Sequence, residues 1–197
     1  MAVRAWKLYQ RILISDPWKT QTLTVGTLVA TGDIITQQLI EKKGTKHDVT
    51  RTVRMGVVGL CLGPILRAWY LTLDKVVVAS SRPKLDGLKK MLLDQALFAP
   101  VCIGFFYCVS EMLSGKTFSQ CKETLKERYT ETLIANYKLW PAAQIVNFSF
   151  VPLEHRVGFV QIVAIFWNTY LAWMVNKPSE LEQARLDQGE KTKNDSN

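Results

Sequence analysis

The sequence is poor in the residues that bind metals or carry catalysis. Its 197 residues include two histidines, His47 and His155, and four cysteines, no two of which form a CxxC pair. These residues do not make up a metal-ligand set. The sequence also lacks a nucleophile elbow and a glycine-rich phosphate loop. We therefore expect no metal and no cofactor, and an enzyme is the weakest of the three functional classes that can be weighed for this chain.

The cysteines are interpreted first as buried thiols. Cys61, Cys102 and Cys108 lie in apolar runs, where cysteine packs as a small hydrophobe. The alternative is a redox-sensitive contact between helices through Cys61 or Cys102. Cys102 and Cys108 are six residues apart, so on one helix they would point about 120° from each other and could not form a disulfide.

The sequence has no block of five or more consecutive basic residues, although its formal net charge is +8. Its lysines and arginines recur between apolar runs instead. That pattern suits anionic lipid headgroups better than a nucleic-acid groove, and no nucleic-acid-binding motif is present. We predict that the lipid bilayer is a partner and that nucleic acid is not bound directly.

Long uncharged runs indicate membrane spans. The clearest, Val157 to Val175, has nineteen residues without a formal charge, enough to cross a hydrocarbon core of ~30 Å. Trp167, Tyr170 and Trp173 crowd its C-terminal half, as expected near an interface. With 48% apolar and 21% charged residues, the composition also leaves a soluble helical bundle open.

Three more runs that are mostly apolar precede this one. They are Trp18 to Ile40, uncharged except for Lys19 and Asp33; Val53 to Ser80; and the stretch between Asp94 and Glu111, in which Pro100 predicts a break. The predicted fold is an all-α, polytopic membrane helix bundle with about four transmembrane helices. Residues 1–177 form its single domain. Residues 178–197 are a polar tail that we expect to be disordered.

The first residues predict an amphipathic helix. Residues 2–15 carry Arg4, Lys7 and Arg11, with no acidic residue before Asp16. This character is typical of a mitochondrial targeting segment. It is equally typical of an interfacial first helix that is never cleaved.

Small and polar residues form stripes on three of the predicted spans. In the first span the stripe follows helical spacing and includes Asp33, which should therefore face the bundle interior. Such stripes can hold helices together or line a water-filled seam that passes solutes. The stripes consist of Gly26, Ala30, Asp33 and Gln37; of Gly56, Gly59, Gly63, Arg67, Tyr70 and Asp74; and of Gln161, Ala164, Asn168 and Ala172.

The ionisable residues on these stripes require partners. Arg67 is a plausible partner for Asp33, because it lies on the corresponding face of the second span. Arg67 and Asp74 are seven residues apart, too far for an ideal intrahelical pair, so each should find a partner on another helix. Asp94 either lies at the interface or faces a polar cavity. The candidate pore or polar-seam residues are Asp33, Gln37, Arg67, Asp74, Asp94, Gln161 and Asn168.

The stretch from Pro141 to Pro152 is bracketed by prolines. A helix between them would rise only ~15 Å, half of a bilayer. It could be a half-helix, a re-entrant turn or the kinked end of a longer helix. Before it, Thr117 and Gln120 fit a capping box that opens an amphipathic helix. Charged residues, including Arg128, should keep that helix out of the hydrocarbon.

A specific motif, WPxxQxxNFxxVPxxxR, spans this stretch. The segments LWPAAQIVNFSFVPLEHR and FWNTYLAW resemble the signature of the Mpv-seventeen and twenty-two-kilodalton peroxisomal membrane protein family. DPWKTQ, GDIITQQLIEKKG and LKKMLLDQALFAP are similar to its inner-membrane member. The resemblance covers roughly residues 6 to 177, but Arg67-Ala68 stand where members typically have glycines. The signature residues are Trp140, Pro141, Gln144, Asn147, Phe148, Pro152, Arg156, Trp167 and Tyr170.

The resemblance implies a four-span protein of the mitochondrial inner membrane, with the peroxisomal membrane as the alternative location. Family members are described as weakly selective channels that modulate membrane potential, limit reactive oxygen species, and support deoxynucleotide supply and mitochondrial DNA maintenance. The second functional class is a non-conducting scaffold for an inner-membrane assembly. A homo-oligomer or inner-membrane complex is a possible partner, and the solute stays open. With four spans, the segments on one side of the membrane carry twelve basic residues and those on the other side carry eleven. The distribution of positive charge therefore does not predict the orientation of the protein in the membrane.

Overall fold

The computed structural model describes residues 2–78, 83–151 and 156–178, and its regular elements are all helices. This confirms the predicted all-α class. In chain order the helices are α1 (Ala2–Ser15), α2 (Pro17–Ile35), α3 (Val49–Val76), α4 (Pro83–Leu93), α5 (Ala99–Leu113), α6 (Phe118–Phe150) and α7 (Arg156–Asn176). They are joined by the π-helical segments η1 (Thr36–Ile40) and η3 (Asp94–Phe98) and by the 3-10 turn η2 (Gly44–Lys46).

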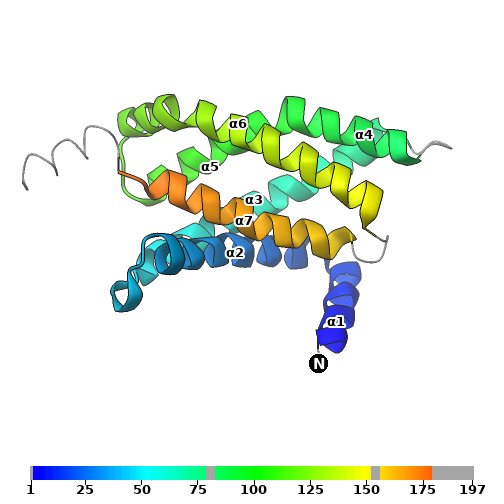
Figure 1. Ribbon diagram of the computed structural model, residues 1–197, viewed down its shortest axis with the longest axis horizontal. Helices are drawn as coiled ribbons and strands as arrows, with labels where there is room; N and C mark the ends of the chain where they lie inside the picture. The colour runs from blue at the N-terminus through cyan, green and yellow to red at the C-terminus, as the bar shows by residue number, and fades with distance from the viewer. Residues whose placement is uncertain (1, 79–82, 152–155, 179–197) are drawn as a thin grey trace, which may run out of the picture.

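The long helices pack into one bundle, with α7 between α2 and α6 and with α3 and α5 behind them (Figure 1). Val29 of α2, Val58 of α3, Phe106 of α5 and Ala172 of α7 are each at most 2% exposed and belong to one core cluster. The helix α1 leaves the bundle at an angle, at the beginning of α2 (Figure 1). All the long helices thus contribute to a common interior.

Three helical stretches among the described residues are long and apolar enough to cross a membrane: Val49–Val76, Leu85–Leu113 and Gly158–Asn176. The chain is therefore an all-α membrane helical protein. The predicted first span, residues 18–40, is not among these three. That residues 18–40 form a fourth transmembrane span stays a prediction.

Threonines recur along α2 and into η1. The hydroxyl groups of these threonines donate to the backbone carbonyl four residues earlier, at 2.8–2.9 Å. Hydroxyls bonded in this way no longer need water, so they are tolerated inside a membrane bundle. The threonines are Thr20, Thr24, Thr27, Thr31 and Thr36.

The α2–α3 contact confirms that the small residues permit close approach. A Cβ atom placed on Gly59 would lie 2.7 Å from the Cα of Gly26, and one on Gly63 would lie 2.5 Å from the Cα of Thr22. Contacts this short mean that the two backbones touch at these positions. No water fits between α2 and α3 there.

The helical structure continues through Pro100. Helix α4, η3 and α5 follow one another without a break from Pro83 to Leu113. Proline lacks an N–H group and its ring collides with the carbonyl four residues earlier, here that of Ala96. The π-helical turn Asp94–Phe98 directly precedes Pro100, and such a wider turn accommodates the misfit.

The proline-bracketed stretch is the end of a longer helix. Helix α6 runs from Phe118 to Phe150 and contains Pro141 in its interior, so the predicted half-helix is wrong and so is the re-entrant turn. The polar first half of α6 continues directly into the proline-bracketed stretch. The complete helix has 33 residues and is therefore much longer than the segment between the two prolines. Its capping box at Thr117 and Gln120 is confirmed, with Thr117 N donating to Gln120 Oε1 at 2.8 Å.

Candidate functional site

The end of the α2–α3 pair carries a buried carboxylate. Asp33 is 0% exposed, as its stripe predicted, and its partner is Arg51 in the first turn of α3. Arg51 Nε donates to Asp33 Oδ1 at 2.7 Å, and Arg51 itself is only 6% exposed. The pair is therefore a buried salt bridge.

Further donors complete the bonds of this carboxylate. Thr52 Oγ1 and Gln37 Nε2 donate to Asp33 Oδ2 at 2.7 and 2.8 Å. Arg51 Nη1 donates to Glu41 Oε2 at 2.8 Å. We call Asp33, Gln37, Glu41, Arg51 and Thr52 the Asp33 cluster. It is a compact, internally bonded group of side chains rather than an open binding site.

The charges around this cluster affect its rim. Burial, the largest cause, raises the pKa of Glu41, but hydrogen bonds from Lys43 and Arg51 outweigh it and the pKa falls below its ordinary value. At the N-cap of α3, the backbone N–H of Arg51 donates to Asp48 and lowers the pKa of that carboxyl. Both carboxylates are thus held in their charged form.

The predicted pairing of Asp33 with Arg67 is wrong. Because α2 and α3 are antiparallel, Asp33 at the end of α2 meets the beginning of α3. Arg67 lies sixteen residues beyond Arg51, which places it about 24 Å along the helix. There its guanidinium carbon lies 6.0 Å from the ring centroid of Trp18, at the beginning of α2.

A second polar group surrounds Asp94 inside the Leu85–Leu113 stretch. Asp94 accepts hydrogen bonds from Trp69 Nε1 at 2.8 Å and from Gln95 Nε2 at 3.1 Å. Gln95 in turn accepts from Asn136 of α6 at 2.7 Å. We call Trp69, Asp94, Gln95 and Asn136 the Asp94 cluster. Among the described residues, Asp94 has no cationic partner.

The remaining predicted seam residues lie apart from these clusters. Asp74 pairs with Lys90 of α4 at 2.6 Å, which confirms that its partner is on another helix. Gln161 Nε2 donates to the hydroxyl of Tyr9 on α1 at 3.1 Å. Asn168 packs against Gly32, where an added Cβ would lie 2.6 Å from the Asn168 carbonyl carbon.

The polar stripes therefore do not form one continuous seam. Arg51 and Trp69 mark the two clusters on α3 and are eighteen residues, or about 27 Å, apart. The glycine contacts of α2 and α3 close the space between them.

The signature residues lie where α6 meets α7. Trp140 contacts Trp167 edge to face with ring centroids 6.5 Å apart, and Tyr170 stacks on Trp167 at 5.5 Å. Asn147 is 4% exposed and donates to Gln144 Oε1 at 3.4 Å, while its own Oδ1 has no hydrogen-bond partner.

Four other signature positions complete the motif. Pro141 lies inside α6, and Arg156 Nε donates to the carbonyl of Val151 at 3.1 Å. Pro152 and the side chain of Phe148 lie outside the part that the structure describes.

The two candidate redox cysteines differ in exposure. Cys61 is exposed on α3 and Cys102 is partly buried on α5, and both are free thiols. A redox contact through either one stays a prediction. Within the described ranges, no group of three or more His, Cys, Asp or Glu residues could hold a metal ion.

Sequence reasoning missed two buried charges. Arg128 was expected at the surface, but it is 4% exposed and donates to the carbonyls of Met174 and Val175 at 2.6 and 3.1 Å. Glu111 is 2% exposed, pairs with Lys116 at 2.8 Å and accepts from Thr124 at 3.0 Å. Arg128 lies on the inward face of α6 with Thr124, Leu125 and Tyr129, so helical spacing could have located Arg128.

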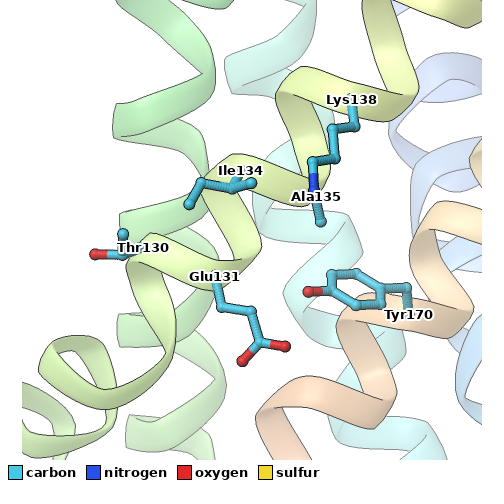
Figure 2. A pocket seen from close by; sticks show the side chains of 6 residues that line it. All are labelled: Thr130, Glu131, Ile134, Ala135, Lys138 and Tyr170. Carbon is cyan, nitrogen blue, oxygen red and sulfur yellow. The ribbon is translucent and has the colours of Figure 1, made fainter.

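A groove of about 540 Å³ lies between α6 and α7 (Figure 2). Tyr170 of α7 points toward it from one side, and the other lining residues all come from α6 (Figure 2). Its wall is mostly apolar, with one acidic and one basic side chain. The lining residues are Thr130, Glu131, Ile134, Ala135, Lys138 and Tyr170.

Comparison with known proteins agrees with the signature. The profile of the Mpv17 / PMP22 family matches residues 111–172. The chain is 48% identical over 174 residues to the mitochondrial inner membrane protein Mpv17 of Xenopus laevis, covering 87% of this chain and 97% of that protein. The chain belongs to the Mpv17 / PMP22 family.

Other Mpv17 relatives are similarly close. Identity is 46% to the protein of Danio rerio, over 87% of this chain and 97% of that one, and 44% to the human protein, over 87% and 98%. No solved structure matches the chain described here. The relatives' location and the three candidate spans make the chain a multi-pass protein of the mitochondrial inner membrane, in place of the alternative peroxisomal location.

Proposed function

We propose that the chain is a channel-like protein that modulates the potential across the mitochondrial inner membrane. The observation that carries the proposal is the carboxylate of Asp94. It lies inside a membrane-spanning stretch, at a π-helical turn, and no cation neutralises it among the described residues. Ionisable residues at such depth commonly belong to ion or solute pathways, and π-helical turns are frequent at functional sites.

The Asp33 cluster has a different role in this proposal. It also adjoins a π-helical segment, Thr36–Ile40, but Arg51 neutralises its carboxylate. We assign it to holding α2 and α3 together. The cation preference of the pathway is therefore assigned to Asp94 rather than to Asp33.

The wider role follows from family resemblance alone. A channel that sets membrane potential would limit reactive oxygen species and support deoxynucleotide supply and mitochondrial DNA maintenance. The proposal assigns no catalytic step to the chain, and the solute is left open.

The second candidate is a non-conducting scaffold for an inner-membrane assembly. It is favoured by the direct backbone contact of α2 with α3 at Gly59 and Gly63, and by the internally bonded Asp33 cluster. Polar side chains on a scaffold would serve interhelical bonding, worth about 0.6 kcal/mol each on average.

Conductance measurements separate the two candidates. The purified full-length protein in planar bilayers should conduct, and Asp94→Asn should shift the reversal potential in asymmetric salt toward weaker cation preference. Asp74→Asn is the matched control, because Asp74 is an exposed acid paired with Lys90. Absence of conductance, together with a stable co-purifying complex, would favour the scaffold.

A further inference from the structure

Arg67 is a partly buried cation that has no ion pair with the described residues. Its Nε atom is buried without a hydrogen bond. Arg51 and Arg128 are more deeply buried, and each has a strong acceptor: Arg51 donates to a carboxylate at 2.7 Å and Arg128 to a carbonyl at 2.6 Å. Inserting an arginine into hydrocarbon costs about 2.5–3.5 kcal/mol, so a missing partner requires an explanation.

The position of Arg67 matches the depth of lipid headgroups. Helix α3 has 28 residues and spans about 42 Å, some 6 Å beyond a ~30 Å hydrocarbon core at each end. Arg67 precedes the final residue, Val76, by nine residues, so its Cα lies only about 7 Å inside that core. A long arginine side chain can extend over this distance to the interface.

Trp18 supports the same depth. It is 48% exposed in the first turn of α2, beside the Arg67 guanidinium. Tryptophan prefers the membrane interface, where its ring is among acyl chains and its N–H is near water. The Arg67–Trp18 pair thus marks where this end of the bundle leaves the hydrocarbon.

The surroundings favour a ligand with an anionic head and apolar tails. One turn beyond Arg67 on α3, Tyr70 and Leu71 are 48% and 36% exposed and present a largely apolar surface. The adjoining helix α1 carries Arg4, Lys7 and Arg11 and no acid, and Asp16, which follows it, lies 3.8 Å from Lys19. The local charge is therefore positive, and the surface beside it suits acyl chains.

We propose that Arg67, with Trp18 beside it, binds the phosphate group of an anionic phospholipid whose acyl chains lie along the outward face of α3. Because the Arg67 side chain is only partly buried, its guanidinium can donate to phosphate oxygens, an anionic partner that the described residues do not supply. This site is separate from the Asp94 pathway and does not depend on whether the chain conducts.

The test measures lipid binding to the full-length protein in an uncharged detergent. Native mass spectrometry follows the titration of phosphatidylglycerol and, separately, of phosphatidylcholine. We expect the wild type to retain phosphatidylglycerol preferentially. Arg67→Gln should weaken that binding about fivefold, the factor that corresponds to ~1 kcal/mol per basic residue. Lys75→Gln is the matched control, because Lys75 is an exposed base on the same helix and its loss should leave the binding unchanged.

Equal losses in the two variants, or no loss in either, would overturn the site. Inorganic phosphate added to the wild type distinguishes the two sources of phosphate: displacement of the bound lipid by millimolar phosphate would mean a soluble ligand and would overturn the lipid proposal. If Arg67→Gln fails to fold, the wild type still tests the idea, since equal retention of phosphatidylcholine and phosphatidylglycerol would contradict it.

Discussion

The Arg51 guanidinium and the Asp33 carboxylate close the end of the antiparallel pair α2–α3, with Nε and Oδ1 2.7 Å apart and both side chains buried. Desolvating two charges costs several kcal/mol per ion, and their attraction compensates only when the remaining hydrogen bonds are made. Here Thr52 and Gln37 make them on the Asp33 side. The pair should therefore be sensitive to removal of either partner.

The first prediction is that Asp33→Asn destabilises the protein by about 3–5 kcal/mol, because it leaves Arg51 buried without its counter-charge. The amount of monodisperse protein after detergent extraction and its thermal stability measure the effect. Asp74→Asn, which removes a surface acid, should cost only about 0–1 kcal/mol. Normal amounts of a stable Asp33→Asn protein would show that the pair has no structural role.

The sequence predicted the inward direction of Asp33 but not its partner. Helical spacing placed Asp33 on the small-residue face, and the structure confirms that it is buried. Arg51 lies before the predicted second span, Val53 to Ser80, although Thr52 lies one turn before Gly56 and extends the same stripe toward Arg51. If consecutive helices are assumed to pack antiparallel, the end of the stripe on the first span lies beside the start of the stripe on the second. That assumption would have placed Asp33 near Arg51.

Other features depended on contacts that no local pattern records. The Pro141–Pro152 stretch looked too short to span because the continuation of α6 from its polar half could not be seen in hydropathy. The burial of Arg128 depends on α7, whose final carbonyls lie 46 and 47 residues further along the chain. The Asp94 cluster joins α3, η3 and α6, and only the tertiary fold brings them together.

The second prediction concerns close packing. Gly63→Ala should destabilise the protein by about 1–3 kcal/mol, because the new Cβ would lie 2.5 Å from the Cα of Thr22 and push α2 from α3. Gly158→Ala is the control: nothing lies within 4 Å of a Cβ there, so the change should be neutral or slightly stabilising. Thermal unfolding of the two variants in the same detergent compares them. Equal stability would contradict a dry α2–α3 contact.

The third prediction concerns the end of α7. Arg128→Met should cost about 2 kcal/mol, because the carbonyls of Met174 and Val175 lose a charged donor where the helix leaves its last carbonyls unpaired. Faster amide hydrogen exchange in the last turn of α7 would locate the effect. Lys126→Met, at an exposed position of the same helix, should leave that exchange unchanged. Slow exchange in both variants would mean that Arg128 does not cap α7.

The last prediction is a pH dependence at the rim of the Asp33 cluster. The folded protein holds the pKa of Glu41 below its ordinary value of 4.5, since the hydrogen bonds from Lys43 and Arg51 outweigh burial. A carboxyl whose pKa is lowered by folding adds stability above its unfolded pKa and loses that stability as the pH falls through the folded pKa. The contribution of Glu41 should therefore be complete at pH 7, begin to decline near pH 4.5 and disappear at lower pH.

Glu41→Gln isolates this contribution from that of all other groups. The thermal midpoint of the variant should lie below that of the wild type at pH 7, and the gap should narrow as both proteins are measured at decreasing pH below about 4.5. Lys42→Gln, an exposed neighbour with no hydrogen bond to Glu41, should leave a gap that does not narrow. A Glu41→Gln gap that stays constant over this range, or widens as the pH falls, would mean that Arg51 and Lys43 do not stabilise the charged form, and the bonds drawn at the rim of the cluster would be wrong.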